Sequence, residues 1–261
     1  MKDYIQFLSF IDLSLEKREL SYHVEPHIKE SNYIRDIVFG FGDGVNTSLG
    51  IVAGIGGASI AVDIVILAAL IGMFTGAKAM AVQNYLAVKS QREILESEIQ
   101  REEYEIDNYP NKEREEIEDI YKSKGFAGPE LDMVVNKIIS NREVWLKTML
   151  TEELGLNLEI IGSPIKGAIV MFISFLMGGI LPIIPYFMVK LGLFPNFIAL
   201  LIAISISLIS SFLIGAIKGK LAKKSWVKGG LEMSLLGTGI ALVGYGIGSE
   251  LGNIGIINTK V

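Results

Sequence analysis

The chain has 261 residues, of which 50% are hydrophobic and 20% charged, with no cysteine and a formal net charge of −5. The missing cysteine excludes a disulfide scaffold, a Cys-ligated metal site and cysteine nucleophile chemistry. The net negative charge argues against a nucleic-acid partner. Charges are unevenly spread, because the segment from Lys89 to Glu159 alone holds 10 basic and 18 acidic residues. This distribution indicates an integral membrane protein with one acidic insert exposed to water.

Five segments are apolar enough, over about 20 residues each, for a helix to cross the hydrocarbon core of a bilayer, which is about 30 Å thick. In chain order they are Ile34–Gly57, Val62–Val88, Ile165–Val189, Phe194–Ile217 and Gly229–Gly248. The sequence therefore predicts an all-α membrane protein with five transmembrane helices and a cytoplasmic helical insert between the second and third. The expected divisions are a short N-terminal helix in 1–32, membrane helices 1 and 2 in 33–88, the acidic insert in 89–160, and membrane helices 3 to 5 in 161–261.

The connection after the fourth segment is rich in lysine and sets the expected orientation. The connections after the first and third segments hold few basic residues, whereas this one contains Lys218, Lys220, Lys223, Lys224 and Lys228. Short loops rich in Lys and Arg stay on the cytoplasmic side. We therefore expect the N-terminus and the acidic insert in the cytoplasm and, after five crossings, the C-terminus outside.

Ionisable residues inside a membrane segment are costly and therefore mark functional candidates. In the first segment Asp36 and Asp43 are seven residues apart, two turns along one helix face, and Asn46 extends that face. A carboxylate in such a position can bind a cation and exchange it for protons, which makes Asp43 the leading candidate for a transport path. Asp36 has an ordinary alternative, namely an interfacial position beside Arg35.

The second segment carries a polar stripe that is a candidate partner for these acids. An Asp on one helix that faces a thioether and two amides on the next forms a transient cation site. The stripe consists of Met80, Gln83 and Asn84. Met80 has an alternative as ordinary packing. Lys78 lies on nearly the opposite face from Met80, and we expect it to neutralise Asp43 or Asp63, or to take the place of a cation in the path.

The insert is predicted to form four helices, interrupted at Pro110, at Gly125 and at Gly128–Pro129. Three pairs of potential ligands are spaced to share one face of a helix; they are Glu102 with Glu105, Glu113 with Glu116, and Met149 with Glu153. Carboxylates bind hard or borderline divalent cations, and a thioether shifts the preference toward softer transition metals. The alternative is a solvated helix surface with ion pairs. With only His23 and His27 and no cysteine, a zinc site of His and Cys is excluded.

Several stretches, taken in their order, resemble the vacuolar iron transporter family. They are YIRDIVFGFGDGVNTSLGIVAGIGGA, GAKAMAVQNYLAVKSQRE, EREEIEDIYKSKGF, NREVWLKTMLTEELGL, MGGILPIIPY and GGLEMSLLGTGIA. The resemblance covers residues from about 33 to 250, nearly the whole chain. It implies a homodimer of five-span subunits that moves Fe²⁺, and often Mn²⁺, out of the cytoplasm in exchange for protons.

Residue by residue, the resemblance assigns metal binding in the insert and in the membrane. The implied insert ligands are Glu102, Glu105, Glu113, Glu116, Glu153 and the thioether of Met149, and the implied membrane site is Asp43 with Met80. The chain departs from the family pattern at Leu150, where a second Met is common. It also departs at Lys78, usually apolar or small, and at Gln83–Asn84, usually Gly-Gly or Gly-Glu.

The leading interpretation is a proton-coupled antiporter of Fe²⁺ first and Mn²⁺ second, which carries the metal as cargo and has no permanent cofactor. No covalent chemistry is required, so we do not expect an enzyme. One alternative is a metal-binding membrane sensor or scaffold without transport, and another is a transporter of a non-metal solute. Short loops and the lack of a targeting sequence favour a prokaryotic plasma membrane.

Overall fold

The computed structural model describes residues 27–58, 60–156 and 162–254, with side chains from residue 33 onward. The described residues form helices and connecting turns. Most of the short N-terminal helix expected in 1–32 lies outside the described residues. The helix that begins the description is α2 (His27–Gly57), which starts one to two turns before the predicted apolar segment.

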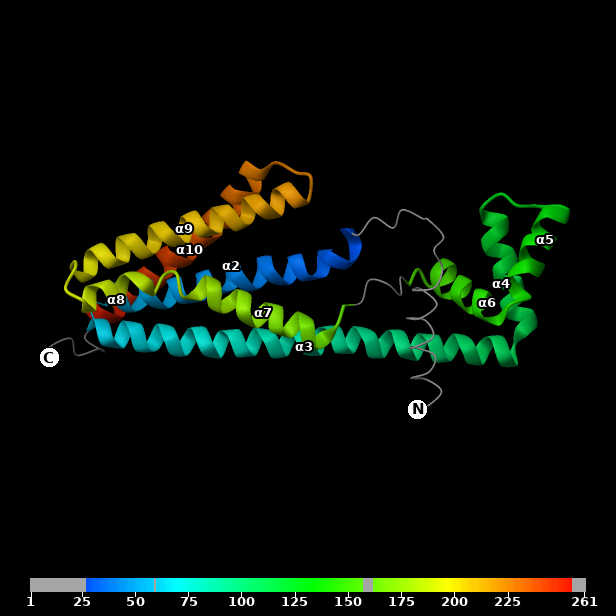
Figure 1. Ribbon diagram of the computed structural model, residues 1–261, viewed down its shortest axis with the longest axis horizontal. Coiled ribbons are helices and arrows are strands. Elements are labelled where there is room, and N and C mark those ends of the chain that lie inside the picture. Colours follow the sequence, from blue (N-terminus) through cyan, green and yellow to red (C-terminus); the bar gives the residue numbers. More distant parts are fainter. Residues whose placement is uncertain (1–26, 59, 157–161, 255–261) are drawn as a thin grey trace.

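The membrane domain is a bundle of long apolar helices that lie side by side in Figure 1. It comprises α2, α3 (Val62–Asn108), α7 (Pro164–Gly179), α8 (Ile184–Lys190), α9 (Asn196–Leu221) and α10 (Trp226–Asn253). Within the described residues, four helices are long and apolar enough to cross a membrane, and α7 with α8 makes a fifth crossing if the pair is one span. The predicted fold class is therefore confirmed.

The third apolar segment differs from the expected single helix, because α7 and α8 are bent by 45° at a short break. Pro182 lies in this break and Pro185 in the first turn of α8. Proline has no backbone N–H and its ring collides with the preceding turn, so two prolines three residues apart prevent a continuous helix. The far end of α8 is fixed by an ion pair of 2.6 Å between Lys190 and Asp63 at the start of α3.

Small residues allow the membrane helices to approach very closely. A Cβ atom added at Gly44 of α2 would lie 2.1 Å from the carbonyl oxygen of Phe175 in α7. A Cβ added at Gly248 of α10 would lie 1.7 Å from the carbonyl oxygen of Gly54 in α2. The α2 helix is therefore held between α7 and α10, with a buried apolar core that includes Phe175 and Tyr186.

The insert begins on α3, which continues well past the membrane domain before it ends at Asn108 (Figure 1). The chain then forms α4 (Pro110–Ser123), α5 (Gly128–Ile139), α6 (Arg142–Thr148) and a π-helical turn, η1 (Met149–Glu153). Asn141 caps α6 by accepting hydrogen bonds from the backbone N–H groups of Glu143 and Val144. A separate apolar core, with Ile106, Ile117 and Met149 among its members, holds these helices together.

Candidate functional site

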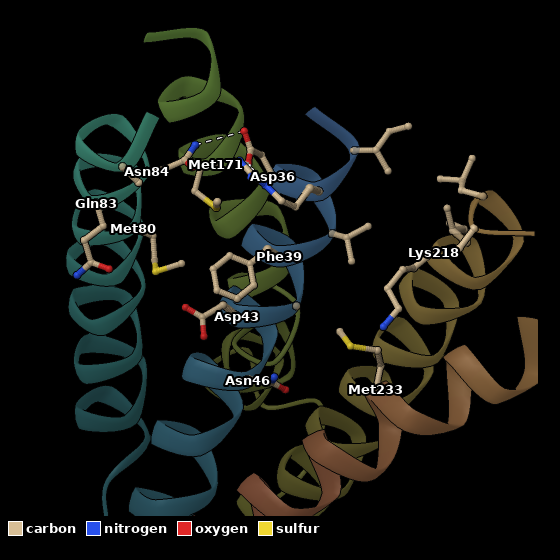
Figure 2. A pocket seen from close by; sticks show the side chains of 18 of the residues that line it. Asp36, Phe39, Asp43, Asn46, Met80, Gln83, Asn84, Met171, Lys218 and Met233 are labelled. Atoms are coloured by element: carbon tan, nitrogen blue, oxygen red, sulfur yellow. Dashed lines mark hydrogen bonds and ion pairs between the residues drawn. The ribbon is translucent and has the colours of Figure 1, made fainter. Parts of the chain in front are cut away.

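The membrane domain contains a cavity of about 1650 Å³, which we call the vestibule. Its walls come from α2, α3, α7, α9 and α10, at the lysine-rich end of the bundle (Figure 2). The predicted residues Asp36, Asp43, Asn46, Met80, Gln83 and Asn84 all line it. The fold thus brings together six of the seven polar or thioether candidates that the two membrane segments supplied.

Asp43 and Met80 face each other across the gap between α2 and α3 (Figure 2). The carboxylate of Asp43 points toward the thioether of Met80. Among the described residues, Asp43 has no ion pair within 4.0 Å, unlike Asp36, which lies two turns earlier on α2. A carboxylate without a cationic partner beside a thioether suits a borderline transition-metal cation.

Asp36 is tied into the helix packing. Its side chain is buried, with 2% exposure, and it accepts hydrogen bonds from Arg35 at 2.9 Å and from Asn84 at 3.3 Å. A Cβ added at Gly167 of α7 would lie 3.1 Å from Asp36 Oδ2, so the absent side chain there makes room for this carboxylate. Asp36 therefore joins α2 to α3 beside α7, in addition to the expected neighbour Arg35.

The opposite wall of the vestibule is formed by α9 and α10. Asn46 points toward this wall (Figure 2), and its Oδ1 atom is buried without a hydrogen-bond partner. Two methionines that the sequence analysis did not single out, Met171 of α7 and Met233 of α10, also line the cavity. With Met80, the vestibule therefore presents three thioethers around its two carboxylates.

Lys78 lies apart from this site. Its side chain is exposed, it does not line the vestibule, and it has no ion pair within 4.0 Å among the residues that the structure describes. The expected pairing with Asp63 is wrong, because Asp63 pairs with Lys190. Gln83 is exposed at the edge of the vestibule, while its neighbour Asn84 bonds to Asp36.

The vestibule is closed beyond Asn46 by contact between α2 and α10. A Cβ added at Gly244 would lie 2.8 Å from the carbonyl oxygen of Gly50, and Gly248 and Gly54 are closer still. The cavity lining is confined to the half of the bundle that carries the lysine-rich connection. The cavity therefore lies at the lysine-rich end, and α2 and α10 are in close contact beyond it.

The insert contains the second candidate site. Carboxylate oxygens of Glu102, Glu105 and Glu113 lie within 4.8 Å of one another, as do those of Glu113, Glu116 and Glu153. Glu113 belongs to both groups, so the five predicted acids form one cluster with a shared central carboxylate. We call it the carboxylate cluster.

The two innermost acids are buried in a way that a solvated surface does not explain. Glu113 is fully buried, Glu102 is 2% exposed, and three of their four carboxylate oxygens have no hydrogen-bond partner. Buried polar atoms without a partner are costly, and a bound cation satisfies them. The outer acids do form ion pairs along the helices, as Glu105 with Arg101 and Glu116 with Lys112. The cluster therefore combines a solvated rim with an unpaired interior.

The electrostatics of the carboxylate cluster favour the protonated form of its inner groups. Burial, followed by repulsion from Glu153, Glu113 and Glu105, raises the pKa of Glu102 to about 8. Burial is also the main cause that raises the pKa of Glu113 and of Glu153 above the ordinary range. Protons therefore compete with cations for the same oxygens near neutral pH.

Met149 lies in the apolar core of the insert and is fully excluded from solvent, at 0% exposure. It opens the π-helical turn η1, which ends at Glu153. Single π turns within helices are rare and are often found at functional sites. This turn was not predicted, because the sequence from Met149 to Glu153 has the spacing of an ordinary helix.

Comparison with known proteins identifies the family that this chain matches. The model of the VIT family matches residues 34–249. A "Vacuolar iron transporter" of Centaurea cyanus is 28% identical over 232 residues, which cover 89% of this chain and 93% of that protein. A "Vacuolar iron transporter" of Toxoplasma gondii is 31% identical over 92% of this chain and 81% of its own length. "Vacuolar iron transporter 1" of Arabidopsis thaliana is 29% identical, with 87% and 90% covered.

Proposed function

Because the chain belongs to the VIT family, we propose that it is a membrane transporter of divalent transition metal, Fe²⁺ first and Mn²⁺ second. The metal leaves the cytoplasm in exchange for protons. The observation that carries this proposal is the unpaired carboxylate of Asp43 beside the thioether of Met80 in the vestibule. The names of the relatives support iron as cargo.

The carboxylate cluster collects the metal first. Glu102 and Glu113 bind with their buried oxygens, and the outer acids Glu105, Glu116 and Glu153 add negative charge around them. The thioether of Met149 is the remaining proposed ligand, and Met149 opens the π-helical turn that ends at Glu153. Protons released from the raised-pKa groups on binding return when the metal leaves.

The vestibule then receives the metal from the same side. Asp43 binds the cation, and Met80 adds a soft contact that favours Fe²⁺ over Mg²⁺. Asp36 and Asn84 hold α2 against α3, so they position Asp43 and Met80 rather than bind the cation. Binding, release and proton exchange involve no covalent step, which is the behaviour of a transporter and not of an enzyme.

The proposed orientation places the lysine-rich end, the N-terminus and the insert in the cytoplasm and the C-terminus outside. It is supported by the lysines after α9. The membrane is a prokaryotic plasma membrane in this proposal, and the working unit is a homodimer. Many apolar side chains on the outer faces of the membrane helices are available to lipid or to a second copy.

The test is Fe²⁺ uptake into sealed proteoliposomes, with and without an acidic interior. Uptake that depends on the gradient, with protons appearing outside as metal enters, is the expected result. A folded protein that binds Fe²⁺ but gives no uptake under either condition contradicts transport, and assigns the chain to the alternative of a metal-binding sensor or scaffold. Fe²⁺ uptake that is the same with and without the pH gradient contradicts only the proposed coupling to protons.

A further inference from the structure

The mouth of the vestibule has a charge that does not suit a cation. Its lining includes Arg35, Lys218, Lys220 and Lys223, against only the two carboxylates deeper inside. Arg35 is paired with Asp36, and Lys218 lies 3.6 Å from Glu232. Among the described residues, Lys220 and Lys223 have no carboxylate within 4.0 Å. Two unpaired ammonium groups at the entrance repel a divalent metal unless an anion neutralises them.

An apolar wall lies directly beside these lysines. Phe39 of α2, Ile217 and Leu221 of α9 and Leu236 of α10 all line the vestibule, and each is more than half exposed. Phe39 lies next to Asp43, between α2 and Met80 of α3 (Figure 2). The same groove therefore offers a hydrophobic surface inside the membrane and a cationic rim at its end. A molecule that matches both has an anionic head and a hydrocarbon tail.

The turn between α9 and α10 lies where such a head is found. Trp226, the first residue of α10, is 56% exposed and packs edge-on against Phe212 at 6.2 Å between ring centroids. Exposed tryptophan is enriched at the headgroup level of membranes. Lys223 lies in the turn after α9, in the left-handed region at φ 53°, and both Lys220 and Lys223 line the vestibule.

We propose that the groove binds an anionic phospholipid of the adjacent leaflet, with its phosphate between Lys220 and Lys223 and one acyl chain along Phe39 and Leu221. The phosphate neutralises the two lysines and replaces a repulsive entrance with one that admits metal. A positive loop alone accounts for orientation, but it does not require that particular lysines face the cavity. Lys224 and Lys228, in the same connection, do not line it and provide the matched control.

The binding test uses the fluorescence of Trp226. The chain has two tryptophans, and Trp145 is buried in the insert with no hydrogen bond to its Nε1 atom, so Trp145→Phe leaves a single reporter. The protein is reconstituted in phosphatidylcholine with a fixed fraction of either brominated phosphatidylglycerol or brominated phosphatidylcholine. We expect the anionic lipid to quench Trp226 more strongly. The excess is the additional quenching by the anionic lipid over that by phosphatidylcholine. We expect the double variant Lys220→Gln, Lys223→Gln to lose this excess and the double variant Lys224→Gln, Lys228→Gln to retain it.

Three results overturn the proposal. Equal loss in both double variants shows attraction by general surface charge and no defined site. Displacement of the excess by inorganic phosphate or soluble glycerophosphoglycerol shows a site for free phosphate compounds. Equal quenching by the two brominated lipids in the Trp145→Phe protein shows that the groove does not select an anionic headgroup.

The effect on entry rests on the proposed function and is measured separately. We expect Fe²⁺ uptake to rise several-fold when phosphatidylglycerol is added to phosphatidylcholine vesicles, and to lose that rise in the Lys220→Gln, Lys223→Gln variant. No uptake in any lipid, with the quenching excess intact, contradicts the transport function and leaves the lipid site standing. Uptake that is independent of anionic lipid, with the excess intact, contradicts the role of the lipid in metal entry.

Discussion

Asn84 on α3 donates a hydrogen bond of 3.3 Å to Asp36 on α2, which joins the two helices that carry Met80 and Asp43. Asn84→Ala leaves Asp36 Oδ2 buried without this partner, and such a loss costs about 1–3 kcal/mol. We expect a lower thermal unfolding temperature in detergent and weaker transport. Gln83→Ala is the control, because Gln83 is exposed and makes no such bond. Equal unfolding temperatures for the two variants contradict the proposed role of Asn84.

Asp43→Asn removes the unpaired carboxylate of the vestibule while it retains the shape of the side chain. We expect proton-coupled Fe²⁺ uptake to fall to background, because the amide carries no charge and cannot exchange a proton for the cation. Metal binding by the carboxylate cluster and the unfolding temperature remain as in the parent protein. The control is Asp63→Asn, since Asp63 lies outside the vestibule. Normal uptake by the Asp43 variant removes the central element of the mechanism.

Glu113→Gln tests the shared position in the carboxylate cluster. Glu113 belongs to both groups of acids, whereas Glu116 belongs to one. We expect Glu113→Gln to weaken Fe²⁺ or Mn²⁺ binding at least about tenfold, equivalent to about 1.4 kcal/mol, and Glu116→Gln to have a smaller effect. Calorimetric titration of the full chain measures both. Glu115 is exposed on the same helix, so Glu115→Gln is the control, and an equal loss there points to general charge instead of ligation.

The pH dependence follows from Glu102, whose pKa burial and neighbouring acids raise to about 8 from its ordinary value of 4.5. Between these values the folded chain holds more protons than the unfolded chain. The metal-free protein therefore loses stability as pH rises from about 4.5 to about 8, by at most about 1.4 kcal/mol per pH unit for one group.

Metal binding has the opposite trend, because a cation replaces the proton. Affinity rises with pH and levels off above about 8. We expect Glu102→Gln to reduce the pH dependence of two quantities, the stability of the metal-free protein and its affinity for metal. Thermal unfolding and metal titrations across the same pH range measure these two profiles. A Glu102→Gln protein whose two profiles match those of the parent shows that another group titrates.

The seal between α2 and α10 is tested by one added methyl group. A Cβ at Gly248 would lie 1.7 Å from the carbonyl oxygen of Gly54, whereas a Cβ at Gly246 would meet nothing within 4 Å. We expect Gly248→Ala to destabilise the membrane domain by about 1–3 kcal/mol, the usual cost of overpacking. Gly246→Ala is neutral or slightly stabilising, since Ala favours helix over Gly. Thermal unfolding of both variants in one detergent makes the comparison, and equal values contradict the close contact.

Sequence patterns predict the membrane helices because bilayer thickness fixes the length of an apolar run. The same patterns locate Asp43 and Met80, which are unusual in their segments. They do not reveal the far wall with Met233, because a methionine in an apolar helix is typical of simple packing. The shared role of Glu113 also depends on how α4 folds back after Pro110, and spacing within one helix carries no information on that angle. The π turn at Met149 has no local sequence signature.

One unbroken helix carries both candidate sites. Met80 and Glu102 are 22 residues apart on α3, which at 1.5 Å per residue is about 33 Å, and at about 100° per residue they differ by only about 40° around the axis. A rigid rod cannot shorten that separation. In the proposed mechanism, a metal ion released by the insert would therefore diffuse along one side of α3 to reach the membrane, and its capture would depend on how long the ion stays near that side. The insert would then act as a local reservoir at a fixed distance from the vestibule.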